Sequence, residues 1–207
     1  MATTSSPRLS RRDQYAALTR EAMLGAAREL FAERGYEATT VEAIARRARV
    51  SSATVYAQAG GKRGLLKSLI LAWSVNDTVR DAPGRWAQVH TAAEKLTQLV
   101  EGTLRVYRDY GDLIEIGRRA AASSPVAAEF TVETRTRFRD LLATFVAQVR
   151  ETGEIADALT DDEAVDVLYF YLRFEQVSLL TRDFGWSQSR AADWLCSRVA
   201  SGLLART

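Results

Sequence analysis

Apolar residues recur at helical spacing along most of the chain. Met23, Leu30 and Phe31 lie on one stripe, and repeats at i, i+3 and i+4 predict amphipathic helices. This first helix is predicted to begin near Thr19, a good N-cap residue, and to end at Gly35. The sequence lacks the sustained alternation of apolar and polar residues that would predict a pair of strands. The pattern therefore predicts an all-α fold with about nine helices.

Turn and capping residues divide the rest of the pattern into helices of different lengths. Gly60 and Gly61 end a third helix, and the turn signal Asp81-Ala82-Pro83-Gly84 ends a fourth. Shorter helices are predicted over about residues 40–49, 52–59 and 62–79. Longer patterns follow over about 86–107, 112–122, 125–149, 160–179 and 187–203.

Charge separates the two ends of the chain. Residues 1–66 contain 11 Lys and Arg against 6 Asp and Glu, whereas residues 67–207 contain 17 against 20. A basic head on a mildly acidic body suggests that the head meets a polyanion, although chance scatter would give the same imbalance. We expect a flexible basic arm over 1–18, a first domain over 19–66, and a second, helical domain over 67–207.

Residues 39–62 carry the functional signal. They encode two short helices joined by a tight turn, with small Ala45 at the crossing and apolar Ile44 and Val55 facing inward. The opposite face of the second helix lacks large apolar groups. This arrangement is typical of a helix-turn-helix that offers its second helix to the major groove of DNA.

Hydroxyl and cationic groups in this region suit phosphate and base contacts. Thr40 opens a helix, where free backbone N–H groups meet an anion. Lys62 also opens a helix, which is unfavourable for the helix dipole unless the lysine serves a purpose such as binding phosphate. The predicted DNA-binding residues are Thr40, Ser51, Ser52, Ala53, Thr54, Tyr56, Gln58 and Lys62.

Over about residues 22–66 the sequence resembles the TetR (tetracycline-repressor-like) family. The matching residues are Ala27, Leu30, Phe31, Gly35, Tyr36, Thr39, Thr40, Val41, Ile44, Ala45, Ala48, Val50, Ser51, Thr54, Val55, Tyr56, Lys62, Leu65 and Leu66. The resemblance implies a two-domain helical fold, a homodimer built on the last two helices, and repression of an operator that a ligand relieves. The chain departs from the family pattern at Arg49, where glycine is usual, and at Ala59, where an aromatic residue is usual.

The second domain carries candidates for a ligand pocket and for the dimer interface. An apolar or aromatic effector is expected among aromatic side chains between helices, although each of them taken singly is more often plain core than part of a pocket. The pocket candidates are Trp73, Trp86, His90, Tyr107, Tyr110, Phe130, Phe138, Tyr169 and Arg173. The interface candidates are Leu172, Leu179, Leu195 and Val199.

Other constellations favour ordinary structural roles. Asp161, Asp162 and Asp166 resemble a metal-binding cluster, but acidic residues are favoured in a first helical turn. His90 is the only histidine, so neither a His-based metal site nor a Ser-His-Asp triad is expected in one chain. The single cysteine, Cys196, is expected to pack as a small hydrophobe and fits a reducing compartment. We therefore expect no catalytic residue, metal or cofactor.

We accordingly expect a cytoplasmic, nucleoid-associated regulator that binds double-stranded operator DNA as a homodimer and spans no membrane. No apolar run approaches the length of a membrane helix. Arg8, Arg11 and Arg12 either reach DNA near the operator or belong to a solvated tail. The alternative functions are a DNA-binding protein that is insensitive to ligands and, less in keeping with the residues, a helical enzyme.

Overall fold

The computed structural model describes residues 10–205 and divides into two compact units. Unit 1 holds residues up to 70 together with 116–128, and unit 2 holds residues 71–115 and those from 129 onward. Within residues 10–205, the only β pairing is an isolated antiparallel bridge between Ile155 and Leu204. The all-α prediction is therefore confirmed.

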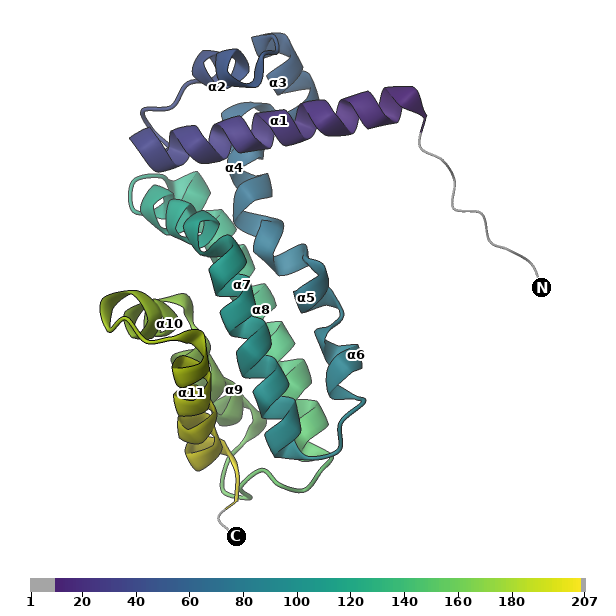
Figure 1. Cartoon of the computed structure of the whole chain (residues 1–207), viewed down its shortest axis with the longest axis vertical. Helices are drawn as coiled ribbons and strands as arrows, with labels where there is room; N and C mark the ends of the chain where they lie inside the picture. Colours follow the sequence, from purple (N-terminus) through teal and green to yellow (C-terminus); the bar gives the residue numbers. More distant parts are fainter. Residues whose placement is uncertain (1–9, 206–207) are drawn as a thin grey trace, which may run out of the picture. The chain divides into compact units, whose positions relative to one another are not determined.

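Unit 1 is built around a long first helix, and shorter helices pack on it (Figure 1). Figure 1 labels these helices α1 (Arg11–Arg34), α2 (Val41–Ala48), α3 (Ser52–Ala59) and α4 (Gly61–Ala72). Met23 and Leu30 of α1, with Val55 of α3, have at most 2% of their surface exposed. The apolar stripe predicted for the first helix is thus the face that α1 buries.

Helix α1 begins eight residues before the predicted start at Thr19. The Ser10 side chain accepts a hydrogen bond from the Asp13 backbone N–H, and the Asp13 carboxylate accepts one from the Ser10 backbone N–H. This capping box satisfies backbone donors that a helix start otherwise leaves unpaired. The hydroxyl of Thr19 instead donates to the Tyr15 carbonyl within the helix. The predicted end at Gly35 is confirmed, with a φ of 79°.

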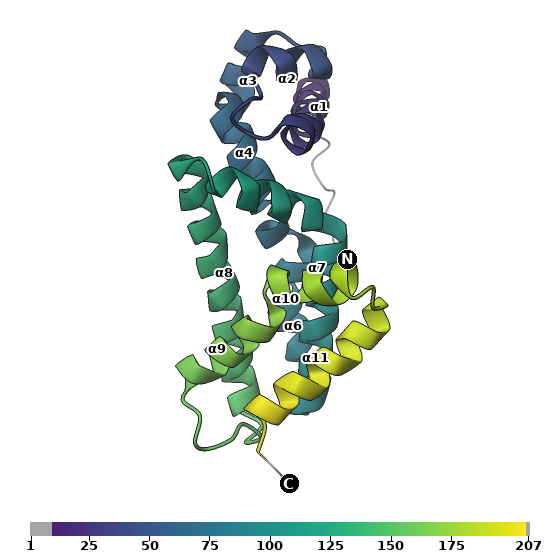
Figure 2. The same cartoon turned by 90° about the vertical axis from the view of Figure 1, so that its left-hand side faces the viewer.

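Unit 2 is a bundle in which α9 packs against α11 and runs into α10 (Figure 2). Its core includes Trp86 against Phe145, with ring centroids 5.1 Å apart and an edge-to-face geometry. The elements are η1 (Trp73–Val75), α5 (Asp77–Arg80), α6 (Ala82–Trp86), α7 (Ala92–Ala121), α8 (Pro125–Arg150), α9 (Asp161–Leu172), α10 (Phe174–Ser178), the π-helical turn η2 (Leu179–Asp183) and α11 (Gln188–Leu203). Helices α4, α7 and α8 contribute residues to both units.

Several predicted boundaries in this part of the chain are wrong. The fourth helix ends at Ala72 rather than near Val79, and the short helix α5 forms the end of that predicted stretch. Helix α6 occupies the region predicted as a turn, with Pro83 in its first turn. Helix α7 passes straight through Gly111, where a break was predicted. The helix predicted over 160–179 is interrupted at Arg173, whose ψ of 156° is extended. Its predicted N-cap, Thr160, is confirmed by a capping box with Glu163.

Candidate nucleic-acid interface and candidate cavity

The helix-turn-helix predicted from residues 39–62 is present as α2, a short turn and α3. The Thr40 hydroxyl caps α2 by accepting from the Ala43 N–H at 3.2 Å, and the Ser51 hydroxyl caps α3 by accepting from the Thr54 N–H at 3.0 Å. Each cap fixes the direction in which its helix starts. Both helices therefore start at a polar side chain that the sequence places there.

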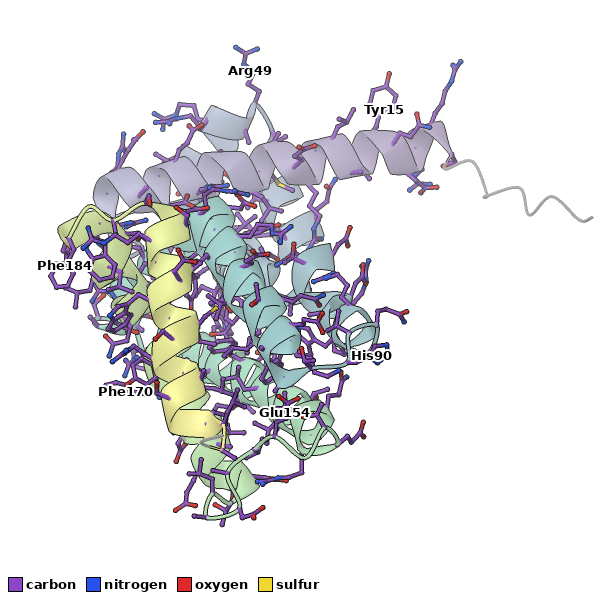
Figure 3. The ribbon with its side chains drawn as sticks, turned by 60° about the horizontal axis from the view of Figure 1, so that its bottom comes forward. Tyr15, Arg49, His90, Glu154, Phe170 and Phe184 are labelled. Atoms are coloured by element: carbon purple, nitrogen blue, oxygen red, sulfur yellow. The ribbon has the colours of Figure 1, made fainter. Side chains whose placement is uncertain are left out.

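Arg49 adopts a left-handed backbone conformation in the turn, with φ 58° and ψ 41°. It is the only residue other than glycine with a positive φ in the described part of the chain. Its N–H donates to the Arg46 carbonyl, and the N–H of Val50 reaches the Ala45 carbonyl at 3.0 Å. The geometry that family members usually build with glycine is thus built here with arginine, and its side chain points into solvent (Figure 3).

Helix α3 presents a face that is free for contact with DNA. Ala53, Tyr56 and Gln58 are exposed, and Ser52 and Thr54 are half-buried. Only Val55 is fully buried and anchors the helix to the core of unit 1. The predicted DNA-binding residues of this helix therefore each keep some accessible surface.

The C-terminal end of α3 is held by its neighbours, although Ala59 replaces the usual aromatic residue. Arg20 of α1 donates to the Gln58 carbonyl at 3.0 Å. A Cβ on Gly64 would lie 1.7 Å from the Ala59 carbonyl oxygen, so only glycine lets α4 approach α3 this closely. The ring of Tyr56 covers Gly61 in the same way. The helix end is thus packed rather than loose.

Lys62 is engaged inside unit 1. Its Nζ donates to the carbonyls of Tyr36 at 2.9 Å and Glu37 at 3.3 Å, and it lies 4.2 Å from the centre of the Tyr36 ring. Burial raises the pKa of the Tyr36 hydroxyl. Lys62 therefore ties the start of α4 to the loop before α2, and a phosphate contact by its ammonium group stays a prediction.

A group of ion pairs connects α2 to α1. The Arg47 guanidinium lies 2.6 Å from the Glu29 carboxylate and 3.2 Å from that of Glu33. The hydrogen bond from Arg47 lowers the pKa of Glu33. All three groups are accessible to solvent, so the contribution of each pair to stability is small. Their effect is to neutralise Arg47, which leaves Arg46 and Arg49 as the more available cations of this segment.

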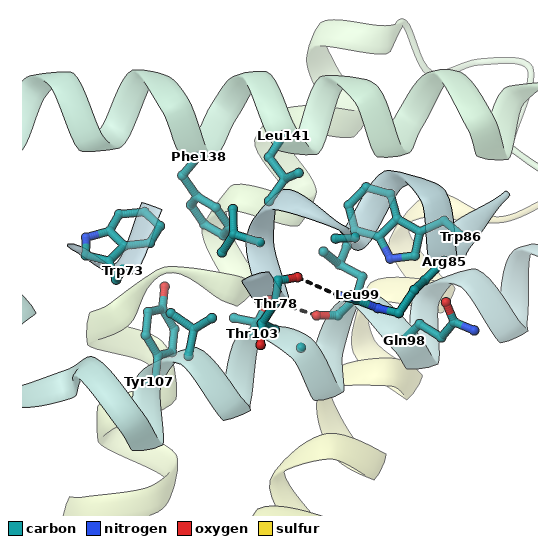
Figure 4. A pocket seen from close by; sticks show the side chains of 14 residues that line it. Trp73, Thr78, Arg85, Trp86, Gln98, Leu99, Thr103, Tyr107, Phe138 and Leu141 are labelled. Atoms are coloured by element: carbon teal, nitrogen blue, oxygen red, sulfur yellow. Dashed lines mark hydrogen bonds between the residues drawn. The ribbon is translucent and has the colours of Figure 1, made fainter. Parts of the chain in front are cut away.

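Unit 2 contains a small cavity lined mainly by apolar and aromatic side chains (Figure 4). Its volume is about 30 Å³, which is about the share of one water molecule in the liquid. Trp73 and Tyr107 lie at one end of the cavity, and Trp86, Arg85 and Gln98 at the other. The Tyr107 hydroxyl donates to the Leu172 carbonyl at 2.7 Å, and burial raises its pKa.

The cavity brings together four of the predicted pocket residues, namely Trp73, Trp86, Tyr107 and Phe138. The other five do not line it. His90 is exposed beside a separate open hollow, Phe130 is buried, and Tyr110 is half-buried. The ring of Tyr169 contacts that of Phe138 in a tilted arrangement, and the Arg173 guanidinium pairs with Glu175 at 2.8 Å. Sequence reasoning did not single out Thr78, Arg85, Gln98 and Thr103, which are polar lining residues.

The predicted interface residues are mostly internal. Leu172, Leu195 and Val199 have no exposed surface in the single chain, whereas Leu179 is 40% exposed. The first three fill the core of unit 2, so they cannot reach a partner while that unit stays folded. Exposed aromatic residues occupy neighbouring positions instead, namely Phe170, Phe184 and Trp194.

The remaining candidates have ordinary surroundings. Asp161 pairs with Arg150 and Asp166 with Arg139, each at 2.7 Å, and no grouping suited to a metal ion occurs among residues 10–205. Cys196 packs at the edge of the core, and burial raises the pKa of its thiol. None of the helices in the described part of the chain has the length and hydropathy needed to cross a bilayer.

Comparison with known proteins assigns the helix-turn-helix part of the chain to a family. The model of the bacterial regulatory proteins of the tetR family matches residues 23–69. Residues 23–69 belong to the tetR family. The HTH-type transcriptional regulator YdeS of Bacillus subtilis is 29% identical over 159 residues, which cover 73% of this chain and 74% of YdeS.

Solved structures share the fold of most of the chain. The SmeT–triclosan complex has a TM-score of 0.75 at 18% identity and covers 90% of this chain and 92% of its own. The transcriptional regulator FadR of Bacillus subtilis in complex with stearoyl-CoA has a TM-score of 0.73 at 20% identity, covering 88% and 98%. Together with the family match, these findings make the chain a DNA-binding transcriptional regulator of the tetR type.

Proposed function

We propose that this protein is a homodimeric repressor that binds a palindromic operator and releases it when a small apolar or aromatic molecule occupies the cavity of unit 2. The observation that carries the proposal is the exposed face of α3 on a tetR-type helix-turn-helix. Two such helices must lie about 34 Å apart, or a multiple, to enter successive major grooves on one face of DNA.

Within this proposal, some residues of α2, α3 and α4 contact DNA phosphates and others contact bases. Thr40 and Ser51 bind phosphate oxygens, because each lies at a helix N-terminus with backbone donors nearby. Of these residues, Gln58 is the best candidate for reading a base, since its amide can form two hydrogen bonds with adenine, at N6 and N7. Tyr56 and Lys62 contact phosphates and carry no base information; Lys62 also supports the loop before α2.

We propose that the first turns of α1 add a second contact with DNA. Arg11 and Arg12 are exposed there, and Tyr15 points to the same side of α1 as Arg49 of the helix-turn-helix (Figure 3). Arg8, predicted to belong to the same arm, lies outside the described residues. Replacing Arg11 and Arg12 together by alanine should reduce DNA affinity several-fold at low salt. Unchanged affinity would leave this segment as a solvated helix end.

The proposed dimer pairs the end of α9, η2 and α11 of one chain with the same segments of a second copy. Trp194 contacts Trp186 and Tyr171, with ring centroids 5.9 and 6.2 Å apart. With Phe170 and Phe184, both more than half exposed, they form a linked group of rings. Exposed apolar groups of this kind mark interaction sites, and a two-fold axis makes one such patch self-complementary.

The size of the cavity is the basis of the proposed switch. A space of about 30 Å³ cannot accept an aromatic molecule without displacing its walls. Trp73 directly follows α4, whose first residues carry Lys62 in unit 1. A ligand that moves Trp73 therefore acts on the helix that begins at the DNA-binding head, and its different affinity for the two states changes DNA binding.

Three experiments test the proposal. Selection of bound sites from random DNA should yield a palindrome; a motif without symmetry would refute the dimeric reader. Calorimetry of a cavity ligand with and without saturating operator should give affinities that differ by the same factor as the operator affinities, about 5–150-fold for a coupling of about 1–3 kcal/mol. Equal affinities would favour a regulator insensitive to ligands. We propose that this protein is not an enzyme. Turnover of any compound in a substrate screen would favour the alternative, a helical enzyme.

A further inference from the structure

The cavity of unit 2 contains a polar group whose hydrogen-bonding capacity is unused. Gln98 lies near the start of α7, and its Oε1 atom is buried without a hydrogen-bond partner. The hydroxyls of Tyr107 and Thr103, by contrast, donate to backbone carbonyls at 2.7 and 2.8 Å. A buried oxygen without a donor is costly to the folded state. Because the hydroxyls of Tyr107 and Thr103 and the guanidinium of Arg85 already have partners within the chain, this oxygen calls for a partner that comes from outside the chain.

Gln98 also stands where a ligand would enter. Together with Thr78 and Arg85, it lines both the cavity and an adjoining open hollow of about 330 Å³. Figure 4 shows it beside Arg85, at the end of the cavity opposite Trp73. A molecule that passes from the hollow into the cavity therefore passes the side chains of Thr78, Arg85 and Gln98.

The charges around this entrance favour a neutral molecule. The Arg85 guanidinium already donates to the Thr78 carbonyl at 2.5 Å. The hollow also carries the carboxylates of Asp77, Asp81 and Glu101 and the guanidinium of Arg105, so charges of both signs line it and neither an anion nor a cation is clearly favoured there. An ion of either sign would lose its hydration inside the apolar cavity without a charged partner. Aromatic walls in turn favour an aromatic body, because edge-to-face contacts add to the area that is buried.

We propose that the effector is a neutral aromatic molecule with an N–H or O–H group that donates a hydrogen bond to Oε1 of Gln98. This inference rests on the proposed function, in which the cavity binds the effector. Gln98 then determines specificity, because it favours a ligand that has a hydrogen-bond donor over a ligand of the same shape that has no donor. A site with an unpaired buried acceptor rejects the analogue without the donor, since that analogue leaves the acceptor unpaired.

Direct binding to the full chain, without DNA, tests the inference. The probes are 2-naphthol and 2-methoxynaphthalene, which differ in the hydroxyl donor, and the tryptophans that line the cavity supply a fluorescence signal. We expect 2-naphthol to bind about tenfold more tightly, which corresponds to about 1.4 kcal/mol. The Gln98→Leu variant should bind the two probes with about equal affinity.

Gln148→Leu is the matched control. Its Oε1 atom is likewise buried without a partner, but it lies beside the separate hollow near His90. This variant should keep the preference for 2-naphthol. The ligand-free Gln98→Leu protein should unfold at the same or a higher urea concentration than the parent, because the unpaired acceptor has been removed. A folded variant that loses only the preference separates recognition from damage.

Four results would overturn the inference. They are equal binding of the two probes by the parent, a preference that survives Gln98→Leu, tighter binding of 2-naphthoate than of 2-naphthol, and no binding of any probe. The proposed function can survive the first three. If 2-methoxynaphthalene binds and still weakens operator binding, the cavity controls DNA binding and only the hydrogen bond to Gln98 is refuted.

Discussion

Replacing Arg49 by glycine should stabilise the DNA-binding head. Arg49 has a φ of 58°, in the left-handed region where a Cβ approaches the following carbonyl oxygen. Its side chain is exposed, and the Val50 N–H bond to Ala45 does not depend on it. Glycine can adopt the same backbone conformation without this penalty, so the substitution removes strain and leaves the turn intact.

The gain follows from two opposing quantities. Relief of the left-handed conformation is worth about 1–2 kcal/mol, and the extra freedom of glycine in the unfolded chain offsets about 0.5–1 kcal/mol. The free energy of unfolding should therefore rise by about 0.5–1 kcal/mol, which corresponds to about 1–4 °C in Tm for a protein of this size. Arg49→Ala is the matched control, because it removes the same charge and keeps the Cβ.

Urea denaturation measured by far-UV circular dichroism gives the comparison. All four tryptophans lie at residues 73–194, in unit 2, so their fluorescence reports the other unit separately. A transition shift in the dichroism of the glycine variant alone is the expected result. If Arg49→Gly and Arg49→Ala have the same stability, the left-handed backbone costs nothing measurable and the reasoning fails.

Three further predictions concern DNA and assembly. Lys62→Ala should weaken binding to all DNA sequences alike and flatten the slope of log K against log salt by about one unit per subunit; Lys67→Ala, on the same helix, is the control, and an unchanged slope for Lys62→Ala would remove it from the phosphate contacts. Gln58→Ala should relax the preference at one base pair in each half-site, at a cost of about 1–3 kcal/mol for the preferred base; an identical selected motif would show that it reads no base. Trp194→Arg should give monomers in sedimentation experiments, whereas Val132→Arg, at a more exposed apolar position on α8, should remain dimeric; a dimeric Trp194→Arg protein would place the interface elsewhere.

The DNA-binding head could be predicted from sequence because its signals are local. Hydroxyl residues at Thr40 and Ser51 cap the helices that they precede, and Gly35 ends α1 as predicted. Each of these signals acts within four residues, where the identity of the side chain determines the hydrogen bond that it makes. The early start of α1 carried the same kind of signal in Ser10 and Asp13. Apolar periodicity does not predict this helix start, because no apolar stripe directly follows Ser10 and Asp13.

Long-range packing explains the errors in unit 2. Gly111 was interpreted as a helix end, yet a Cβ there would lie 3.1 Å from the Arg182 guanidinium and 3.6 Å from the Phe174 ring. The glycine therefore serves the close approach of a distant segment and not a local turn. The same applies to Gln98, which looks like one polar residue of an amphipathic helix. Only the structure reveals that its oxygen is enclosed without a partner.

The last helix explains why apolar periodicity alone misplaced the dimer interface. Helix α11 has large apolar residues on more than one face, and successive residues differ by about 100° around a helix axis. Leu195 and Val199 share the inner face and are fully buried, whereas Trp194 lies one step around the helix and is 37% exposed. A charge at Leu195 would therefore disrupt the core of unit 2 and could not separate loss of pairing from loss of folding. A charge at Trp194 leaves that core in place, so the oligomeric state of the Trp194 variant reports on the interface itself.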